Sequence, residues 1–290
     1  MTATLGGGLG LALGSAAALN WGYFAQHRAA GGLPPLTLRH PLRSLVLLFR
    51  ERSWLVGFLV GIGGWVLYVA ALELAPLSLV QATSAGGIGI LALLAWQATG
   101  ARPTSWELAG VGAAVVGLVL LGVSLAGQHG GGRQPGWQPV ALWLACSAAA
   151  AGGAALVGGR GALAPGAGLG AAAGLLYAAG DVGTKAAVAG GGRLGFVPAL
   201  LACHGLAFVA LQLGFQRGTA LATAGVATLL TNALPIVAGT ALFHEGLPGG
   251  ALGALRVLAF AAVVAGAAGL ARSEPAAAPS SPDMALERVG

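Results

Sequence analysis

The sequence predicts an all-α fold, a polytopic transmembrane bundle of about nine spans in two related halves. Only 8% of the 290 residues are charged and 57% are hydrophobic, and the mean hydropathy is +0.84. The apolar residues gather in runs of about 20, the length that crosses a hydrocarbon layer. Short patterns of the first half of the chain return in the second half. Because so few charges cannot build a water-exposed surface, the bilayer is the expected solvent.

The predicted spans follow one another with short connections. They cover about 5–26, 54–73, 77–98, 107–126, 139–159, 163–187, 195–215, 219–243 and 250–271. The first run has no basic residue before it and meets Arg28 directly after it, which is the reverse of a secretory signal. We therefore expect a retained first helix with its N-terminus outside.

The distribution of basic residues tests this topology, because cytoplasmic loops of membrane proteins are rich in arginine and lysine. The side predicted to be outside the cell holds Arg133 and Arg193, with Lys185 and Arg256 near its membrane edge. The predicted cytoplasmic side collects Arg28, Arg39, Arg43, Arg50, Arg52, Arg102, Arg160, Arg217, Arg272 and Arg288. We expect a multi-pass protein of the cell membrane with a cytoplasmic C-terminus. The net charge of +6 then reflects orientation, and no nucleic-acid partner is expected.

Two segments lie outside the spans. Segment 28–53 contains a short apolar run flanked by arginines, and we expect it along the cytoplasmic interface near anionic headgroups. A tenth span over 36–50 is the alternative, but burying Arg43 would cost about 3 kcal/mol or more. Residues 272–290 combine proline, serine, alanine and alternating charge, so we predict a disordered cytoplasmic tail.

An internal repeat relates the two halves. The aligned stretches are 20–30 with 178–187, 71–80 with 213–222, and 99–104 with 243–248. Gly22 thereby pairs with Gly180, and four-helix copies occupy 1–126 and 163–271, joined by an extra helix at 139–159. Because five spans separate corresponding helices, the copies must be inverted. Inverted repeats are typical of carriers that expose a midplane site to either side in turn.

A family resemblance rests on the stretch from Trp54 to Gly110. It contains the passages Ala71 to Gln81, Gly100 to Pro103 and Trp106 to Gly110. These residues resemble the drug/metabolite transporter superfamily, in its EamA-like and NIPA-like branches, over about 5–271. The resemblance implies a membrane transporter. Nine spans are closer to the NIPA-like branch, for which it implies Mg²⁺ transport. The family's usual glutamate in the turn is Ala101 in the first copy and Glu245 in the second.

Polar side chains within spans mark the candidate site, because each is costly in lipid and normally faces a cavity or another helix. Asp181 and Lys185 are four residues apart on one helix face. They form either an ion pair that lets the helix insert or a carboxylate that responds to a proton or cation. His204 is alone, as a hydrogen-bonded structural residue or a proton carrier. The other predicted substrate-binding residues are Asn20, Gln81, Thr83, Ser84, Tyr177, Thr228, Thr231 and Asn232.

Three further patterns concern packing and gating. The polar residues at 81–84 and 228–232 take roughly equivalent places in the two copies, and either line a cavity or hydrogen-bond between helices. Arg256, near the outer face, is expected either to extend to the membrane surface or to pair with Glu245, and a gating role for these two residues is the functional alternative. Four-residue glycine spacings, which arise either by chance or for close helix packing, are Gly6/Gly10/Gly14, Gly57/Gly61, Gly170/Gly174 and Gly249/Gly253.

The sequence is compatible with three functions. The leading hypothesis is a secondary-active transporter of a small metabolite or drug-like solute, and the alternative is a divalent-cation transporter with Glu73, Asp181 and Glu245 as its acids. A membrane scaffold or enzyme is the third hypothesis. No catalytic residue, metal framework or cofactor is predicted, because no nucleophile or metal motif occurs and Cys146 and Cys203 lie in apolar runs. Monomer and homodimer both stay open.

Overall fold

A computed structural model describes residues 2–37, 41–74, 87, 89–98, 104–125, 134–161, 163–188, 191–244 and 250–272. In these ranges all regular structure is helical and no strand occurs, which confirms the predicted all-α fold. The helices are α1 (Thr2–Gly31), α2 (Pro41–Arg50), α3 (Arg52–Leu74), α5 (Ser105–Leu125), α6 (Trp137–Gly159), α7 (Ala167–Val188), α8 (Val197–Arg217), α9 (Val226–Ala241) and α10 (Ala251–Arg272), with a 3₁₀ helix η1 (Gly191–Phe196) and a π-helix η2 (Leu221–Gly225).

Each predicted span contains described helical residues, including 89–98 in the third. By length and composition, four described segments can cross a membrane, namely Trp137–Gly159, Gly192–Arg217, Leu221–Gly239 and Ala251–Leu270. Shorter apolar helices occur at Arg52–Tyr68 and Gly89–Ala98. The structure therefore supports a membrane-spanning protein, and the number nine stays a prediction.

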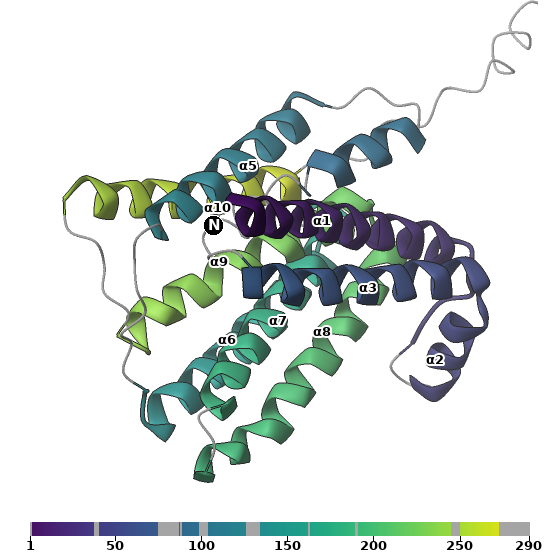
Figure 1. The fold of residues 1–290 in the computed structure, drawn as a ribbon. Coiled ribbons are helices and arrows are strands. Elements are labelled where there is room, and N and C mark those ends of the chain that lie inside the picture. The colour runs from purple at the N-terminus through teal and green to yellow at the C-terminus, as the bar shows by residue number, and fades with distance from the viewer. Residues whose placement is uncertain are drawn as a thin grey trace, which may run out of the picture.

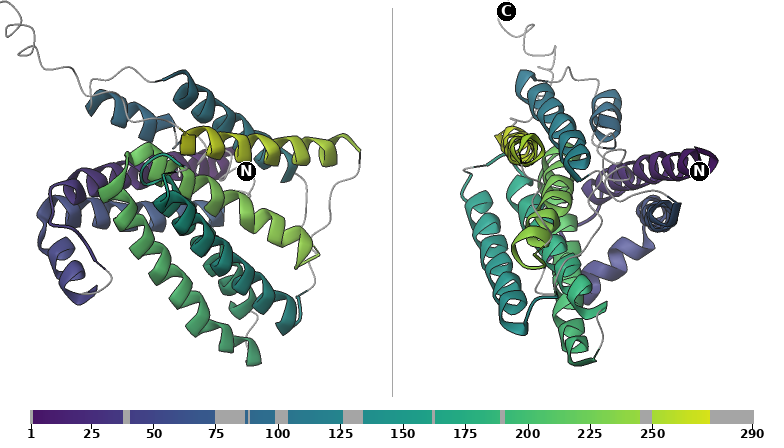
Figure 2. Two further views of the ribbon diagram at one scale, coloured as in Figure 1. Left: turned by 180° about the vertical axis from the view of Figure 1, so that it is seen from behind. Right: turned by 60° about the vertical axis from the view of Figure 1, so that its left-hand side comes forward.

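The helices form two crossing sets (Figure 1). Helices α1 and α3 lie side by side and run in opposite directions, and α5 packs against α10 close to them. Helix α7 lies at the centre of the second set, in contact with α6, α8 and α9. The views from behind and from the side show the second set running obliquely to α1 and α3 (Figure 2). Contacts between α1 and α8 join the two sets.

Glycine permits the closest of these approaches. A Cβ on Gly22 of α1 would lie 2.7 Å from the carbonyl oxygen of Gly57 on α3, so side chains here would force the helices apart. A Cβ on Gly174 would lie 2.7 Å from the carbonyl oxygen of Ala227. Two of the predicted glycine pairs thus mark close packing. At Gly6 and Gly10 an added Cβ would meet no atom of the described residues within 4 Å, so these two positions give no sign of close packing within that part of the chain.

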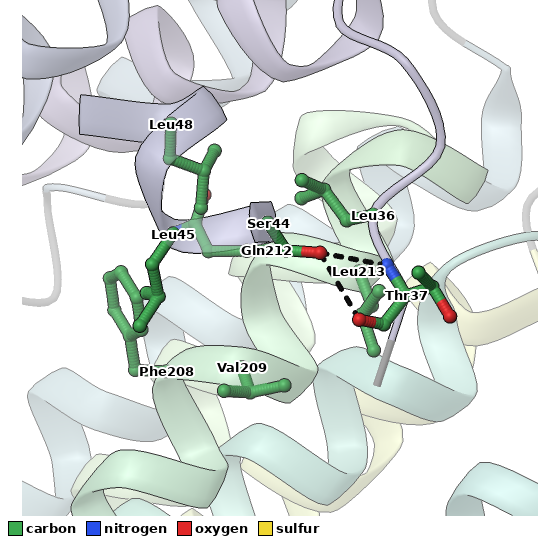
Figure 3. A pocket seen from close by; sticks show the side chains of 9 residues that line it. All are labelled: Leu36, Thr37, Ser44, Leu45, Leu48, Phe208, Val209, Gln212 and Leu213. Atoms are coloured by element: carbon green, nitrogen blue, oxygen red, sulfur yellow. Dashed lines mark hydrogen bonds between the residues drawn. The ribbon is translucent and has the colours of Figure 1, made fainter. Parts of the chain in front are cut away.

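Helix α2 is a short, separate element of ten residues. At about 1.5 Å per residue it is too short to cross a hydrocarbon core of about 30 Å, which argues against the tenth span over 36–50. The Ser44 hydroxyl fixes the preceding loop, because it accepts a hydrogen bond from the Thr37 amide and donates one to the Thr37 carbonyl (Figure 3). Leu45 and Leu48 line a small cavity of about 60 Å³ against α8.

Candidate functional site

A carboxylate and an imidazole meet where α7 packs on α8. Oδ1 of Asp181 lies 3.4 Å from Nε2 of His204, and Nδ1 of His204 lies 2.9 Å from the carbonyl oxygen of Leu200. Gly180 makes room for this contact, because a Cβ there would overlap the His204 ring. The side chains of His204 and Asp181 are 36% and 47% exposed, so neither is buried within the helix bundle.

The chemistry of the Asp181–His204 pair depends on the protonation state of His204. A neutral imidazole has one N–H donor and one acceptor nitrogen, whereas the imidazolium donates at both nitrogens. Both ring nitrogens of His204 face oxygen acceptors, from Asp181 and from Leu200. Only the protonated form therefore donates a hydrogen bond to each of them. The geometry favours binding of a proton next to Asp181.

Two tyrosines complete the group, which we call the Asp181 cluster: Tyr23, Tyr177, Asp181 and His204. The Tyr177 ring meets the His204 ring edge-on, with centroids 5.9 Å apart. Tyr23 of α1 and Tyr177 pack against the same group of buried apolar residues, which includes Phe215 of α8. The cluster thus draws on α1, α7 and α8, and it combines residues of both predicted copies.

The structure changes the predicted partner of Asp181. Spacing along α7 predicts an ion pair with Lys185, but the carboxylate lies against His204 of the neighbouring helix. The ammonium of Lys185 lies 4.4 Å from the centre of the Phe243 ring, in a cation–π contact. Helical spacing fixes which residues share a face, but it does not fix which way each long side chain turns. His204, expected to be alone, has a partner.

A buried chain of hydrogen bonds joins α1, α3 and α8. The Trp54 indole donates to Gln212 Oε1 at 2.8 Å, and Gln212 Nε2 donates to Gln26 Oε1 at 2.9 Å. We call Gln26, Trp54 and Gln212 the glutamine network. The sequence did not predict this group. Gln212 lies in an apolar run, which was a signal, but the distant partners could not be found from spacing along one helix.

A second set of bonds lies one turn further along α8. Gln216 Nε2 donates to the carbonyl oxygens of Ala30 and Pro34, and Gln216 Oε1 accepts from the Leu36 amide. Nε2 of His27 lies 2.8 Å from the carbonyl oxygen of Gly218. Together with the glutamine network, these contacts tie the end of α1 to the end of α8, on the side predicted to be cytoplasmic.

Two of the remaining predicted polar residues, Asn20 and Asn232, bond within their own helices. Asn232 Nδ2 donates to the Thr228 carbonyl at 2.7 Å, and Asn20 Nδ2 donates to the Ala16 carbonyl at 2.8 Å. Asn20 Oδ1 is buried, and no described residue forms a hydrogen bond with it. Thr228, Thr231 and Asn232 are partly exposed on α9. Predicted residues Gln81, Thr83, Ser84 and Glu245 lie outside the described residues.

Arg256 is buried rather than extended towards the membrane surface. Its side chain is 6% exposed, and it donates to the hydroxyl and carbonyl oxygens of Ser124 at 3.3 and 3.2 Å. These bonds join α10 to the end of α5. Arg256 therefore helps to hold α10 against α5. Its predicted partner Glu245 lies outside the described residues.

Metal-binding groups are sparse in the described ranges. Among these residues no set of three or more histidine, cysteine, aspartate or glutamate side chains lies close enough to hold a metal ion. Cys146 and Cys203 are free thiols. A hydrated cation that keeps most of its water would need fewer protein ligands, and Asp181 is the exposed carboxylate of the Asp181 cluster.

Comparison with known proteins gives one informative similarity. The chain is 32% identical over 121 residues to a protein of Arabidopsis thaliana described as probable magnesium transporter NIPA9. The match covers 41% of this chain and 33% of that relative, so the chain matches about a third of the relative's length. No family model matches the chain, and no solved structure matches it significantly. The similarity supports the NIPA-like side of the resemblance, and the comparisons add nothing for the EamA-like side.

Proposed function

We propose that this protein is a secondary-active membrane transporter that moves a small metabolite or drug-like solute by alternating access. The main support for this proposal is the Asp181 cluster, in which Asp181 on α7 pairs with His204 on α8 beside Tyr177. Tyr23 of α1 packs against the same apolar residues as Tyr177. Ionisable side chains are rare inside transmembrane bundles, and they commonly mark ion or proton pathways. Residues from both predicted copies contribute to this site, as expected for a carrier with repeated halves.

Helix packing supports the inverted repeat. Gly22 and Gly180, which align in the sequence, both lie where the first helix of a copy meets its second helix, α3 in one copy and α8 in the other. The fourth helices of the copies, α5 and α10, pack against each other. A Cβ on Gly117 of α5 would lie 2.7 Å from the Val263 amide nitrogen of α10. A contact between corresponding helices is compatible with a two-fold relation between the copies.

The Asp181–His204 pair provides a mechanism for coupling. With a proton on His204, the imidazolium neutralises Asp181 and donates to it. When the proton leaves, the carboxylate regains an uncompensated negative charge that a cationic group can neutralise. A proton and a positively charged solute therefore compete for one site. Exchange of the two across the membrane follows if each half-cycle exposes the site to one side.

The contacts at the far end of α8 suit a gate. The glutamine network and Gln216 bind α1, α3 and α8 together on the predicted cytoplasmic side. Access from this side requires that these bonds break. Each hydrogen bond contributes a net stabilisation of about 1 kcal/mol, so these few bonds can break and re-form during a conformational cycle.

Mg²⁺ is the second candidate cargo, because of the similarity to the probable magnesium transporter NIPA9. Mg²⁺ binds through one or two carboxylates while keeping several waters, so a single exposed Asp181 is compatible with it. The exchange mechanism is the same for this ion. The two cargoes differ in which solute displaces the proton.

Transport by purified protein in sealed vesicles tests the proposal. We expect a pH gradient to drive accumulation of one member of a panel that contains organic cations, neutral metabolites and Mg²⁺. Asp181→Asn should lower this flux about tenfold or more, whereas Glu51→Gln, a change of a partly exposed carboxylate in the connection before α3, should preserve it. Absence of flux across the panel would refute the transporter. Unchanged Mg²⁺ flux in Asp181→Asn would remove Asp181 from a magnesium pathway.

A further inference from the structure

An open groove of about 720 Å³ lies between α1 and α3, away from the Asp181 cluster. Its two walls come from the last turns of α1 and the first turns of α3. This end of the helices carries Arg28 and Arg52, and the predicted topology places it at the cytoplasmic membrane surface. The proposed transport mechanism makes no use of this groove.

The outer part of the groove is basic. Arg28 and Arg52 both line it and both are exposed, and neither forms a salt bridge within the described part of the chain. The Arg28 guanidinium lies 5.8 Å from the centre of the Phe24 ring, which holds it over the groove wall. Two guanidinium groups that line one groove can each donate paired, charge-assisted hydrogen bonds to the oxygens of a phosphate group.

Glu51, the acidic residue next to Arg52, does not lie in the groove. Glu51 accepts hydrogen bonds from the hydroxyl and the amide of Ser53, at 2.5 and 3.3 Å, and these bonds lower the pKa of its carboxyl. Glu51 therefore stays ionised at the start of α3, and it does not line the groove. The two arginines leave the groove itself with positive charge.

The inner part of the groove is apolar. Trp21 and Val56 line it, and their side chains are 39% and 49% exposed. Trp21 lies seven residues before Arg28, about 10 Å deeper along α1 at 1.5 Å per residue. Tryptophan is enriched at this depth, where hydrocarbon meets headgroups. The groove thus changes from charged to apolar along its length, in the order of a phospholipid.

We propose that this groove binds an anionic phospholipid of the surrounding membrane. Arg28 and Arg52 bind the phosphate, and the glycerol and first acyl carbons lie against Trp21 and Val56. Basic pockets between helices on the cytoplasmic side are suited to anionic headgroups. Because Gly22 and Gly57 bring α1 and α3 together beneath the groove, a bound lipid would bridge the two helices of this pair. The proposal is independent of the transported solute.

Lipid retention by the intact protein tests this site. The protein is incorporated into nanodiscs of mixed phosphatidylcholine and phosphatidylglycerol, released, and analysed by native mass spectrometry. We expect retained phosphatidylglycerol in excess over phosphatidylcholine. The double variant Arg28→Gln/Arg52→Gln should retain about tenfold less phosphatidylglycerol, since two charge-assisted contacts are lost. Arg160→Gln, a matched change of an exposed arginine at the end of α6, should behave like the unmodified protein.

Three results would overturn the proposal. The first is that the double variant retains as much phosphatidylglycerol as the unmodified protein. The second is that Arg160→Gln loses as much of this lipid as the double variant does. The third is that millimolar inorganic phosphate displaces the lipid, which would identify a site for phosphate alone. Should the double variant fail to fold, Arg28→Lys/Arg52→Lys serves instead. It keeps both charges but loses the forked donors, so we expect an intermediate loss of phosphatidylglycerol, and unchanged retention would contradict the site. Trp21→Ser should weaken retention without changing the lipid preference.

Discussion

His204 on α8 lies with its Nε2 atom 3.4 Å from a carboxylate oxygen of Asp181 on α7. The other ring nitrogen faces the Leu200 carbonyl at 2.9 Å, so the imidazole is held between two acceptors. This relationship links protonation of one side chain to the charge of another. In the proposed mechanism, this pair exchanges a proton for a cation.

Asp181→Asn separates a functional role from a structural one. The pair is partly exposed, so its contribution to stability is about 1 kcal/mol or less. We expect the thermal unfolding midpoint in detergent to change little. Transport should fall about tenfold or more, because a charge-assisted interaction with the solute is lost. A fall in stability that matches the loss of transport would assign Asp181 to structure, and Glu51→Gln serves as the charge-matched control.

Gly22→Ala tests the contact between α1 and α3. The new methyl group would lie 2.7 Å from the Gly57 carbonyl oxygen, so the helices must separate. Overpacking of this kind costs about 1–3 kcal/mol, and we expect a lower thermal unfolding midpoint. Gly10→Ala on the same helix is the control, since its methyl group would meet no atom within 4 Å among the residues that the structure describes. Equal effects of the two substitutions would contradict the observed packing.

Gln212→Leu tests the glutamine network. The leucine keeps the volume but leaves the Trp54 indole N–H and the Gln26 oxygen buried without partners. Each unsatisfied group costs about 1–3 kcal/mol, so chemical denaturation of the detergent-solubilised protein should reveal a clear loss of stability. Gln97→Leu, at an exposed position in the helix at 89–98, should leave stability unchanged. If both variants behave alike, the network does not join the helices.

Cysteine labelling from each side of the membrane tests the inverted repeat. Helices α1 and α7 correspond in the alignment, so their C-terminal ends should lie on opposite faces. In a background without Cys146 and Cys203, an impermeant maleimide should label Gly192→Cys in intact cells and Arg28→Cys only after permeabilisation. A Cβ at Gly192 meets no atom within 4 Å, so the substitution fits. Labelling of both positions from the same face would show parallel copies.

The helical fold was predictable because it depends on local composition. Runs of apolar residues fix where helices form in a bilayer, and described helices occur in every predicted span. The short α2 was foreseen for the same reason, since arginines flank its apolar run. Glycine spacing was less informative. Gly57 faces another backbone and Gly10 does not, and only the relative placement of helices decides this.

The site was predicted in its residues but not in its connections. Asp181 and His204 stood out as ionisable groups in apolar runs, yet their contact joins two helices whose relative rotation the sequence does not reveal. The same limit applies to the glutamine network, where Gln26 and Gln212 are 186 residues apart. Spacing along a single helix, as for Asp181 and Lys185, predicts a shared face only.

Solute uptake driven by a pH gradient in reconstituted vesicles tests the proposed function most directly. A cationic solute or Mg²⁺ should accumulate against its gradient in vesicles that contain the unmodified protein. In His204→Gln the flux should no longer respond to the pH gradient, because the amide cannot bind the exchanged proton. Uptake by His204→Gln with an unchanged response to pH, or no uptake of any solute by the unmodified protein, would contradict proton-linked transport through the Asp181 cluster.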